Sequence, residues 1–555
     1  MNNPRTIGGG IAVIEKMALG KRWRGLKKVM TPEEAVQMIH SGDTISVCGI
    51  SAALTPDKVL AALGNQFLKT GSPRDLTMVF PLAVGDAYEI KGMEHLAHEG
   101  MIKRLIGGSF TVARSSEQPP KIYEMIVHNQ VEAYNFPSGV LMQLHREIAA
   151  KRPGVITEVG LGTFVDPRQE GGKMNDATQE DLVEIIRLHE KEYLFFPSLL
   201  INIALIRGTT ADEDGNITME HEYSTSFVLA LAMAARNSGG KVIAQVKRLA
   251  ARGTMHPQLV KVPGMLVDVI VVDEHQKLTT GIDHDPSASG ELRIPWETLE
   301  PGSLDIMKQV LVRRILRELR SGDVVNLGFG ITALVPQIAL EEGVLDQLTF
   351  TTEHGAIGGF PYSGIQFGGA LNPQALIEAT SQFDFIDGGG PDVVCLSFAE
   401  VDREGNVNVT KLRELPHVLA GAGGFIDLIQ NARKIIFCGT LTAGGLKVEI
   451  SEGRVKIVKE GKTQKFVERV QQITFDGQFA RKKAQDVIFV TERGVFDLEP
   501  DGLVLREIAP GLDVERDILS QIGFKLKVAH DLKEMDQTIF RSEPMGLKQT
   551  DPWRQ

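Results

Sequence analysis

The sequence predicts an α/β protein built from two related open α/β domains fused in tandem, each with a largely parallel sheet flanked by helices. Apolar strand-like runs such as 267–273 alternate with helix-like stretches such as 303–320, which is the pattern of a sheet covered by helices. The second half of the chain also repeats the order of elements found in the first half. A chain of 555 residues is long enough for two large domains.

The repeat starts at two Ser-Gly-Asp turns, 41–43 and 321–323. Each turn follows a helix-like stretch and leads into a buried strand, a glycine loop and a helix with an early proline. Farther along, strands at 204–209 and 393–398 each lead to an acidic turn with Gly-Asn and then resume. We interpret these turns as hairpins, because both lack the closing glutamate of an EF-hand calcium loop.

The two halves meet in a segment of linker composition, 285–305, which is rich in proline, serine and glycine. We therefore expect an N-terminal domain over 1–295, with residues 1–30 as an extension, and a C-terminal domain over 296–555. Within the second domain, 448–475 alternates apolar and charged residues, which predicts an antiparallel addition.

Composition and charge argue against two classes of partner. The net charge of −11 is spread along the chain without a basic block, so no nucleic-acid partner is expected. The apolar run 194–206 is interrupted by polar residues and is too short to span a bilayer, so we expect a buried strand region and no membrane partner. A basic cluster inside 1–30 fits a solvated arm, with an anionic-ligand contact as the alternative.

Cysteine usage bears on the compartment. Cys48, Cys395 and Cys438 are far apart in the sequence and show no CxxC spacing. They fit small buried side chains in a reducing compartment. The first 30 residues lack an apolar core of signal-peptide length. These features together predict a cytoplasmic protein.

Glu353 is the most informative single residue. It follows the strand-like run 348–352 and precedes a glycine-rich segment, 355–359. This order places a carboxylate at the exit of a strand, where backbone can approach a ligand closely. A carboxylate there can act as a base, a metal ligand or a covalent nucleophile. On spacing alone, a strand-end glutamate followed by a turn is an equal alternative.

Two glycine-rich loops precede helix-like stretches. Segment 328–333 follows a strand and matches a short GxGxxA dinucleotide fingerprint. Pro336 and Gly343 interrupt the helix that an NAD site requires, so a loop lining an anionic ligand is favoured over NAD and over a purely structural turn. Segment 421–425 is either a flexible connection or a turn whose N–H groups face a developing oxyanion.

No metal site is predicted from the histidines. His95 and His98 lack the HExxH order, and Asp283-His284-Asp285 is interpreted as a polar turn. No Gly-x-Ser-x-Gly elbow presents a serine nucleophile either, which leaves the carboxylate of Glu353 as the candidate reactive group.

The segment 352–359 around this glutamate resembles the active-site segment of family I CoA transferases, most of all the single-chain acetate/3-ketoacid group. The resemblance spans roughly residues 30–540, and its further matches are 135–140, 162–168 with 171–173, 381–385, 405–409 and 421–427. Members of that family have two fused halves of one fold, which agrees with the repeat.

The resemblance implies roles for individual residues. Glu353 would be the nucleophile that forms a glutamyl-CoA thioester, and the amide of Gly421 would belong to the oxyanion hole. Lys447 would be a further CoA contact. Ser138 stands where family members often carry a glutamine that assists the oxyanion hole, which leaves that donor open. The residues that would line the CoA path are Gly328, Phe329, Gly330, Ile331 and Thr332.

The function implied is transfer of CoA between a short-chain acyl-CoA and a carboxylic acid such as acetate, by ping-pong kinetics. CoA would be a substrate, no cofactor would be permanently bound, and a homo-oligomer (dimer or tetramer) is expected. Since an unperturbed glutamate has a pKa of about 4.3, the nucleophile would be ionised at neutral pH without a base. The alternatives are an acyl-CoA hydrolase on the same fold and a non-catalytic CoA- or anion-binding module.

Overall fold

The computed structural model describes residues 28–110, 119–300, 302–412 and 421–554. The expected N-terminal extension and its basic cluster therefore lie almost entirely outside the described residues. Lys28 is the described member of that cluster, and its ammonium group donates to the carbonyl oxygens of Asp214 and Gly264. Within these ranges, no helix combines the length and apolarity needed to cross a bilayer.

The first half of the chain is organised around a sheet whose central strands are buried on both faces. Every residue of β8, the longest apolar strand at its centre, is buried, as expected for a strand covered by helices on both sides. The helices of this half are α3 (Pro32–Ala35), α4 (Asp57–Thr70), α5 (Lys121–Val127), α6 (Ser138–Ala149) and α7 (Val228–Asn237). The strands of the sheet, in spatial order, are β11 (Val260–Val262), β9 (Ile217–Thr218), β8 (Ile203–Asp212), β1 (Thr44–Val47), β2 (Leu76–Phe80), β3 (Ile102–Gly107) and β4 (Glu132–Asn135). In addition, β10 (Lys241–Ala250) pairs with β8, and β12 (Val269–Val272) pairs with β10.

The second half contains a sheet with a parallel centre and antiparallel pairs on either side of it. The helices of this half are α8 (Ile306–Leu316), α9 (Val335–Glu341), α10 (Ala379–Asp387), α11 (Phe425–Gln430) and α12 (Gly477–Lys482). The strands, in spatial order, are β18 (Ala375–Leu376), β15 (Ala356–Ile357), β14 (Thr349–Thr351), β13 (Val324–Leu327), β19 (Val393–Ser397), β22 (Lys434–Cys438), β28 (Asp486–Val490), β29 (Gly494–Glu499), β30 (Gly502–Ile508) and β31 (Lys527–Glu534).

The internal repeat is visible in the pairing of the strands. In the first half, β2, β1, β8, β10 and β12 are adjacent in that order and all parallel. In the second half, β14, β13, β19, β22 and β28 have the same order and direction. Each Ser-Gly-Asp turn needs a glycine with positive φ, 83° at Gly42 and 93° at Gly322. The predicted α/β class and the tandem repeat are confirmed.

The acidic turns also fold as predicted. Asp212 accepts hydrogen bonds from the amides of Asp214 and Asn216 and closes the β8–β9 hairpin. Asp402 does the same between β20 (Glu400–Asp402) and β21 (Val407–Asn408). In both hairpins the aspartate side chain therefore accepts hydrogen bonds from the backbone of its own turn.

The smaller sheets lie beside the two large ones. The predicted antiparallel addition is present as β24 (Lys447–Ser451) and β25 (Arg454–Lys459). The run 194–206, expected to be one buried strand region, is instead divided at Pro197 between two sheets, since proline ends the ladder there. The remaining short strands are β5 (Gly154–Thr157), β6 (Glu184–Leu188), β7 (Lys191–Pro197), β16 (Phe360–Pro361), β17 (Ala370–Leu371), β23 (Thr442–Ala443), β26 (Thr463–Gln464) and β27 (Phe466–Val467).

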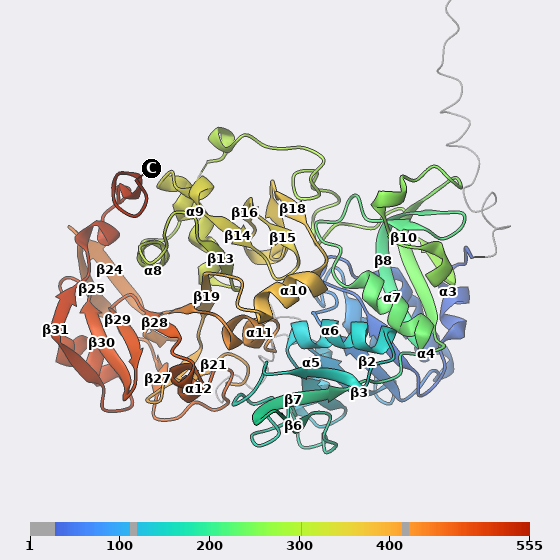
Figure 1. The fold of residues 1–555 in the computed structure, drawn as a ribbon, viewed down its shortest axis with the longest axis horizontal. Coiled ribbons are helices and arrows are strands. Elements are labelled where there is room, and N and C mark those ends of the chain that lie inside the picture. Colours follow the sequence, from blue (N-terminus) through green and yellow to red (C-terminus); the bar gives the residue numbers. More distant parts are fainter. Residues whose placement is uncertain (1–27, 111–118, 301, 413–420, 555) are drawn as a thin grey trace, which may run out of the picture.

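The two halves lie side by side, with α6 of the first packed against α10 and α11 of the second (Figure 1). One buried apolar cluster runs through this junction from Val140 and Leu144 to Phe383 and Ile426. The strands of one large sheet come from residues before 273 and those of the other from residues after 323. The proposed boundary at 295/296 falls in the intervening segment and stays a prediction.

Candidate active site

A cavity of about 450 Å³ lies between the two halves. Apolar side chains form most of its wall, including Leu82 and Phe110 from the first half and Phe367 and Leu396 from the second. A pocket of this composition, at the junction of two domains, is the usual setting for a small-molecule site.

Glu353 reaches this cavity from the turn between β14 and β15. The turn is tight: the amide of Ala356 donates to the hydroxyl of Thr352, and Gly355 has a φ of 101°. As a residue, Glu353 is partly exposed and lines the cavity. Its Oε2 atom is buried and has no hydrogen-bond partner among the described residues. The predicted strand exit is confirmed and lies beside the cavity, and the role of Glu353 as the reactive group stays a prediction.

Burial changes the acidity of this carboxylate. Desolvation raises the pKa of Glu353 to about 7, while the backbone N–H of Gly424 favours the charged form and opposes the shift. The expectation of an unperturbed glutamate is therefore wrong, because it took no account of the apolar wall. A carboxylate with a raised pKa is more basic and less solvated than one in water, and both properties make it a stronger nucleophile.

The loop 421–424 brings glycine backbone against the carboxylate from the start of α11. A Cβ atom at Gly424 would lie only 1.7 Å from Oε2 of Glu353, so any other residue there would displace this carboxylate. The amides of Ala422 and Gly423 already donate, to Oδ1 of Asn135 at 2.8 Å and to the carbonyl of Gly108 at 2.8 Å. Of these loop amides, that of Gly424 is the one that faces Glu353.

Gly421 also lines the cavity, with a φ of 76°. A Cβ atom there would lie 2.9 Å from both Nδ2 of Asn135 and the carbonyl oxygen of Gly108. The role of its amide as an oxyanion donor stays a prediction. The geometry adds Gly424, which the sequence interpretation missed because nothing in the sequence separates one glycine of this run from the next.

Ser138 does not face the cavity. Its side chain is fully buried, and its hydroxyl donates to the carbonyl oxygen of Pro81 at 2.6 Å. Its backbone amide donates to the carbonyl of Gly423 at 2.9 Å. Ser138 therefore supports the glycine loop through its backbone amide, and its hydroxyl is not available as an oxyanion donor.

Asn135 is the larger support of that loop. Its Nδ2 donates to the carbonyls of Gly107 and Gly108, at 3.0 and 2.6 Å, while its Oδ1 accepts from the amide of Ala422. One buried amide side chain thus ties the end of β3 in the first half to the loop of the second. Asn135 begins one of the family-like segments, which was the available sequence signal for it.

The predicted CoA path is only partly at the cavity. Gly328 and Phe329 line it, and the exposed ring of Phe329 packs edge-on against Phe367 with a centroid separation of 5.4 Å. Thr332 is fully buried, and its hydroxyl donates to the carbonyl of Gly328, so it shapes the loop rather than a ligand surface. Gly330 and Ile331 lie between them, outside the cavity wall.

The same loop argues against a dinucleotide site. The residues after Gly330 form a single 3₁₀ turn, Ile331–Leu334, before the short helix α9, whereas a dinucleotide fingerprint needs a full helix N-terminus. Lys447 begins β24 as an exposed residue and is not part of the cavity wall. Its contact with CoA stays a prediction.

His354 has a structural position next to the candidate nucleophile. Its side chain is buried, and burial lowers its pKa to about 3, so the ring is neutral. Its carbonyl oxygen accepts a hydrogen bond of 2.6 Å from the hydroxyl of Ser224 in the first half. The turn that carries Glu353 is therefore held from both halves of the chain.

Comparison with known proteins bears on the family of this chain. A sequence model described as Coenzyme A transferase matches residues 29–273. Acetate CoA-transferase YdiF of Escherichia coli (strain K12) is 42% identical over 528 residues, which cover 95% of this chain and 97% of that protein. The chain belongs to the coenzyme A transferase family.

Two further matches place this CoA transferase more closely. Caffeate CoA-transferase of Acetobacterium woodii is 43% identical, over 94% of this chain and 99% of that protein. The crystal structure of the acyl-CoA transferase YdiF from Escherichia coli O157:H7, a thioester complex with CoA, has a TM-score of 0.87 and 40% identity, over 94% of this chain and 98% of that one. The predicted family is confirmed, and CoA is a substrate of this transferase rather than a bound cofactor.

Proposed function

We propose that this transferase moves CoA from a short-chain acyl-CoA to a free carboxylate such as acetate, through a covalent thioester on Glu353. One observation carries the choice of residue. Two carboxylates line the cavity, Asp86 and Glu353. Both carboxylate oxygens of Asp86 already accept hydrogen bonds from the protein. Its Oδ1 accepts from the amides of Tyr88, Glu89 and Ile90, and its Oδ2 accepts from the hydroxyl of Thr280. Among the described residues, Oε2 of Glu353 has no hydrogen-bond partner.

The proposed reaction conserves the activation of the acyl group. The Glu353 carboxylate attacks the thioester carbonyl, the C–S bond breaks, and an acyl–glutamyl anhydride and CoA thiolate result. The thiolate then attacks the glutamyl carbonyl carbon, which releases the first acid as a carboxylate and leaves a glutamyl-CoA thioester. The incoming acid reverses these two steps. A serine nucleophile would instead fall to a stable ester and lose the activation.

The environment of Glu353 supports this chemistry. An apolar wall keeps water away from two intermediates that water would destroy, and it raises the pKa of the nucleophile to about 7. The tetrahedral intermediates place negative charge on an oxygen bound to the glutamyl or acyl carbon. We propose the amides of Gly421 and Gly424 as its donors, and a donor of this kind contributes about 2.7–4 kcal/mol in measured analogues.

The size of the acid is a separate part of the proposal. The related proteins are named for acetate and for caffeate, and the cavity has an apolar wall that includes Phe110, Ile365 and Val409. We keep short-chain acids as the proposed substrates. Measuring kcat/KM for acetate and caffeate as acceptors with one acyl-CoA donor distinguishes them, and a preference for caffeate would overturn that choice.

Steady-state kinetics test the proposed function. Initial rates with acyl-CoA and acceptor both varied are expected to give parallel double-reciprocal lines, because the first acid leaves before the second binds. Intersecting lines would indicate direct transfer in a ternary complex. Release of free CoA in the absence of any acceptor, at a rate that acetate does not change, would favour the hydrolase alternative.

We also propose that the enzyme is a cytoplasmic homo-oligomer, a dimer or tetramer. The support for the compartment is that Cys48, Cys395 and Cys438 are buried free thiols, which suits a reducing environment. Light scattering on the purified full-length chain measures the oligomeric state, and a mass of one chain at working concentrations would contradict it.

A further inference from the structure

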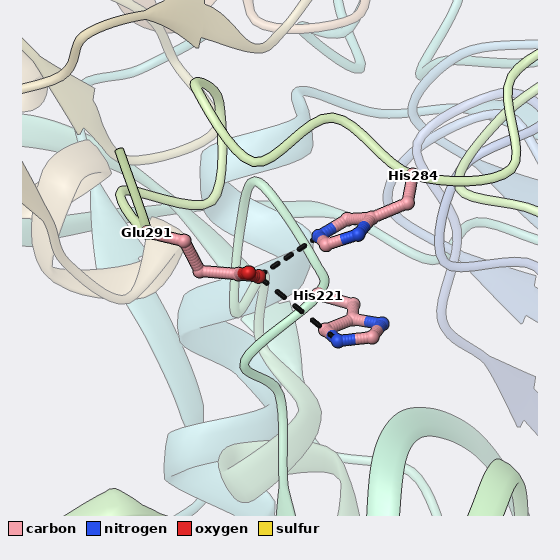
Figure 2. Close-up of side chains that lie close together, drawn as sticks. All are labelled: His221, His284 and Glu291. Carbon is pink, nitrogen blue, oxygen red and sulfur yellow. Dashed lines mark hydrogen bonds and ion pairs between the residues drawn. The ribbon is translucent and has the colours of Figure 1, made fainter. Parts of the chain in front are cut away.

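A cluster of potential metal ligands lies outside the cavity, where the first half meets the segment between the halves. It consists of His221, His284 and Glu291, whose side chains point toward one another (Figure 2). His221 follows β9 in the first half, whereas His284 and Glu291 belong to the segment after β12. None of the three lines the cavity around Glu353.

The distances within this cluster suit a small coordination sphere. Nε2 of His284 lies 2.8 Å from Oε1 of Glu291, and Nε2 of His221 lies 4.0 Å from the same oxygen. One ligand atom from each residue can be chosen so that all lie within 4.8 Å of one another. In tetrahedral zinc sites with bonds of about 2.0–2.1 Å, ligand atoms are separated by roughly 3.3 Å. The two measured separations fall on either side of that value.

We propose that His221, His284 and Glu291 bind one Zn²⁺ ion, with the fourth position open to water. Two imidazoles and a carboxylate are a known ligand set for zinc, and imidazole nitrogen suits zinc better than it suits the oxygen-preferring Mg²⁺ or Ca²⁺. The two rings are stacked, with centroids 4.0 Å apart and planes at 16°. Zinc binding requires them to rotate until both Nε2 lone pairs converge.

Arg248 is the neighbour that competes with the ion. Its Nη2 lies 3.3 Å from Nε2 of His221, but the same atom also donates to Oε1 of Glu220 at 2.8 Å. Its Nε donates to the hydroxyl of Thr210. Two of its three contacts are therefore with groups other than the proposed ligands, so Arg248 keeps partners when zinc takes the lone pair of His221.

The inferred ion has a structural consequence for the transferase. Three residues after His221, Ser224 donates to the carbonyl of His354 in the nucleophile turn. Next to His284, Asp285 accepts a hydrogen bond of 2.7 Å from the hydroxyl of Tyr362 in the second half. Zinc would join the two segments that carry these contacts, and so would stabilise the junction of the halves without touching the reacting atoms.

Zinc titration of the full-length chain tests the site. The wild type, His284→Ala and Glu291→Gln proteins are stripped with EDTA, dialysed and titrated with ZnCl₂ by calorimetry. His530→Ala serves as the matched control, since His530 is an exposed histidine on β31. The wild type and the control are expected to bind one more zinc ion than either site variant. The affinity for that ion should fall more than ~100-fold, because loss of even an outer partner of a ligand costs ~10–100-fold.

Two further measurements distinguish loss of the zinc site from a folding defect. Unfolding temperature is expected to rise with ZnCl₂ in the wild type and in His530→Ala, and to stay unchanged in the two site variants. With Co²⁺ in place of zinc, the wild type should show the visible absorption of a tetrahedral site. Equal zinc stoichiometry and affinity in all four proteins, or no zinc bound by the wild type in the titration, would overturn the proposal.

Discussion

The strand β2 of the first half and the strand β14 of the second occupy equivalent places, and their ends meet at the same cavity. In each, an amide at the start of the strand pairs with the Ser-Gly-Asp turn: Thr77, the second residue of β2, donates to the carbonyl of Asp43, and Thr349, the first residue of β14, donates to that of Asp323, both at 3.0 Å. Counting from these residues, Pro81 stands where the second half has Glu353. Equivalent backbone positions therefore lead into the apolar wall of the cavity in the first half and carry the carboxylate in the second half.

This difference shows how a duplicated fold supplies an asymmetric site. The first half provides Leu82, Ala83 and Phe110, which exclude water from the cavity. The second half provides the carboxylate and the glycine loop that contacts it. A second nucleophile at the position of Pro81 would add a carboxylate next to a cavity already lined by Asp86 and Glu353, where like charges disfavour each other's ionisation.

The largest expected effect comes from removing the nucleophile. Glu353→Gln keeps the shape of the side chain but cannot form the thioester, and transferase kcat is expected to fall by ~10⁴-fold or more, as for other covalent nucleophiles. The equivalent change in the first half, Pro81→Ala, keeps the carbonyl that Ser138 uses and should retain most of the activity. Comparable losses in the two variants would contradict the proposed division of roles.

Gly424→Ala is expected to have the next largest effect. The φ of Gly424 is −86°, which alanine adopts without strain, but the new Cβ would meet Oε2 of Glu353. We expect kcat to fall by ~10²–10³-fold, the loss seen when one oxyanion donor is disturbed. The same clash should lower the unfolding temperature of Gly424→Ala. In a Glu353→Ala background this loss of thermal stability should largely disappear. A loss that persists would show that the new Cβ clashes with another group.

Substitutions at Gly421 are informative only when stability is measured together with activity. Gly421→Pro removes the amide N–H, and Gly421→Ala would normally serve as its control. Here the alanine variant is itself strained, by the φ of 76° and by the approach of Asn135 and Gly108. Both variants are therefore expected to lose stability as well as activity. Unfolding temperatures measured with the kinetics separate the two effects.

The pH dependence follows from the raised pKa of about 7 at Glu353. Because the ionised form is the nucleophile, kcat/KM for the acyl-CoA should fall about tenfold per pH unit below that value and level off above it. The sign for stability is opposite: a carboxyl with a raised pKa makes the fold less stable as pH increases from about 4.5 to about 7. Glu353→Gln should remove that pH-dependent loss, and an identical pH–stability profile in both proteins would argue against the shift.

The smallest expected effect comes from the support of the glycine loop. Asn135→Ala leaves several buried backbone groups without partners and should lower the free energy of unfolding by about 1–3 kcal/mol. Asn175→Ala removes a similar pair of hydrogen bonds, to the carbonyls of Ile126 and Val131 far from the cavity wall. Both variants should lose stability, but only Asn135→Ala should also lower kcat. Equal kcat values would limit Asn135 to a structural role.

The sequence was sufficient for features that depend on neighbours in the chain. The Ser-Gly-Asp turns, the hairpins at Asp212 and Asp402 and the strand exit at Glu353 are set by local turn chemistry. Features that depend on contacts between the halves were missed: the acidity of Glu353 depends on the apolar wall, and the buried orientation of Ser138 depends on Pro81. His284 was interpreted as part of a polar turn because its partner His221 lies 63 positions earlier in the sequence.

The central claim is that Glu353, and not its counterpart position in the first half, carries the covalent intermediate. Incubating the full-length protein with acetyl-CoA and no acceptor, followed by digestion and peptide mass spectrometry, measures this directly. We expect the peptide containing Glu353 to gain the mass of CoA, and to lose that mass when acetate is added. CoA attached to any other residue, or an unmodified protein under conditions where turnover proceeds, would contradict it.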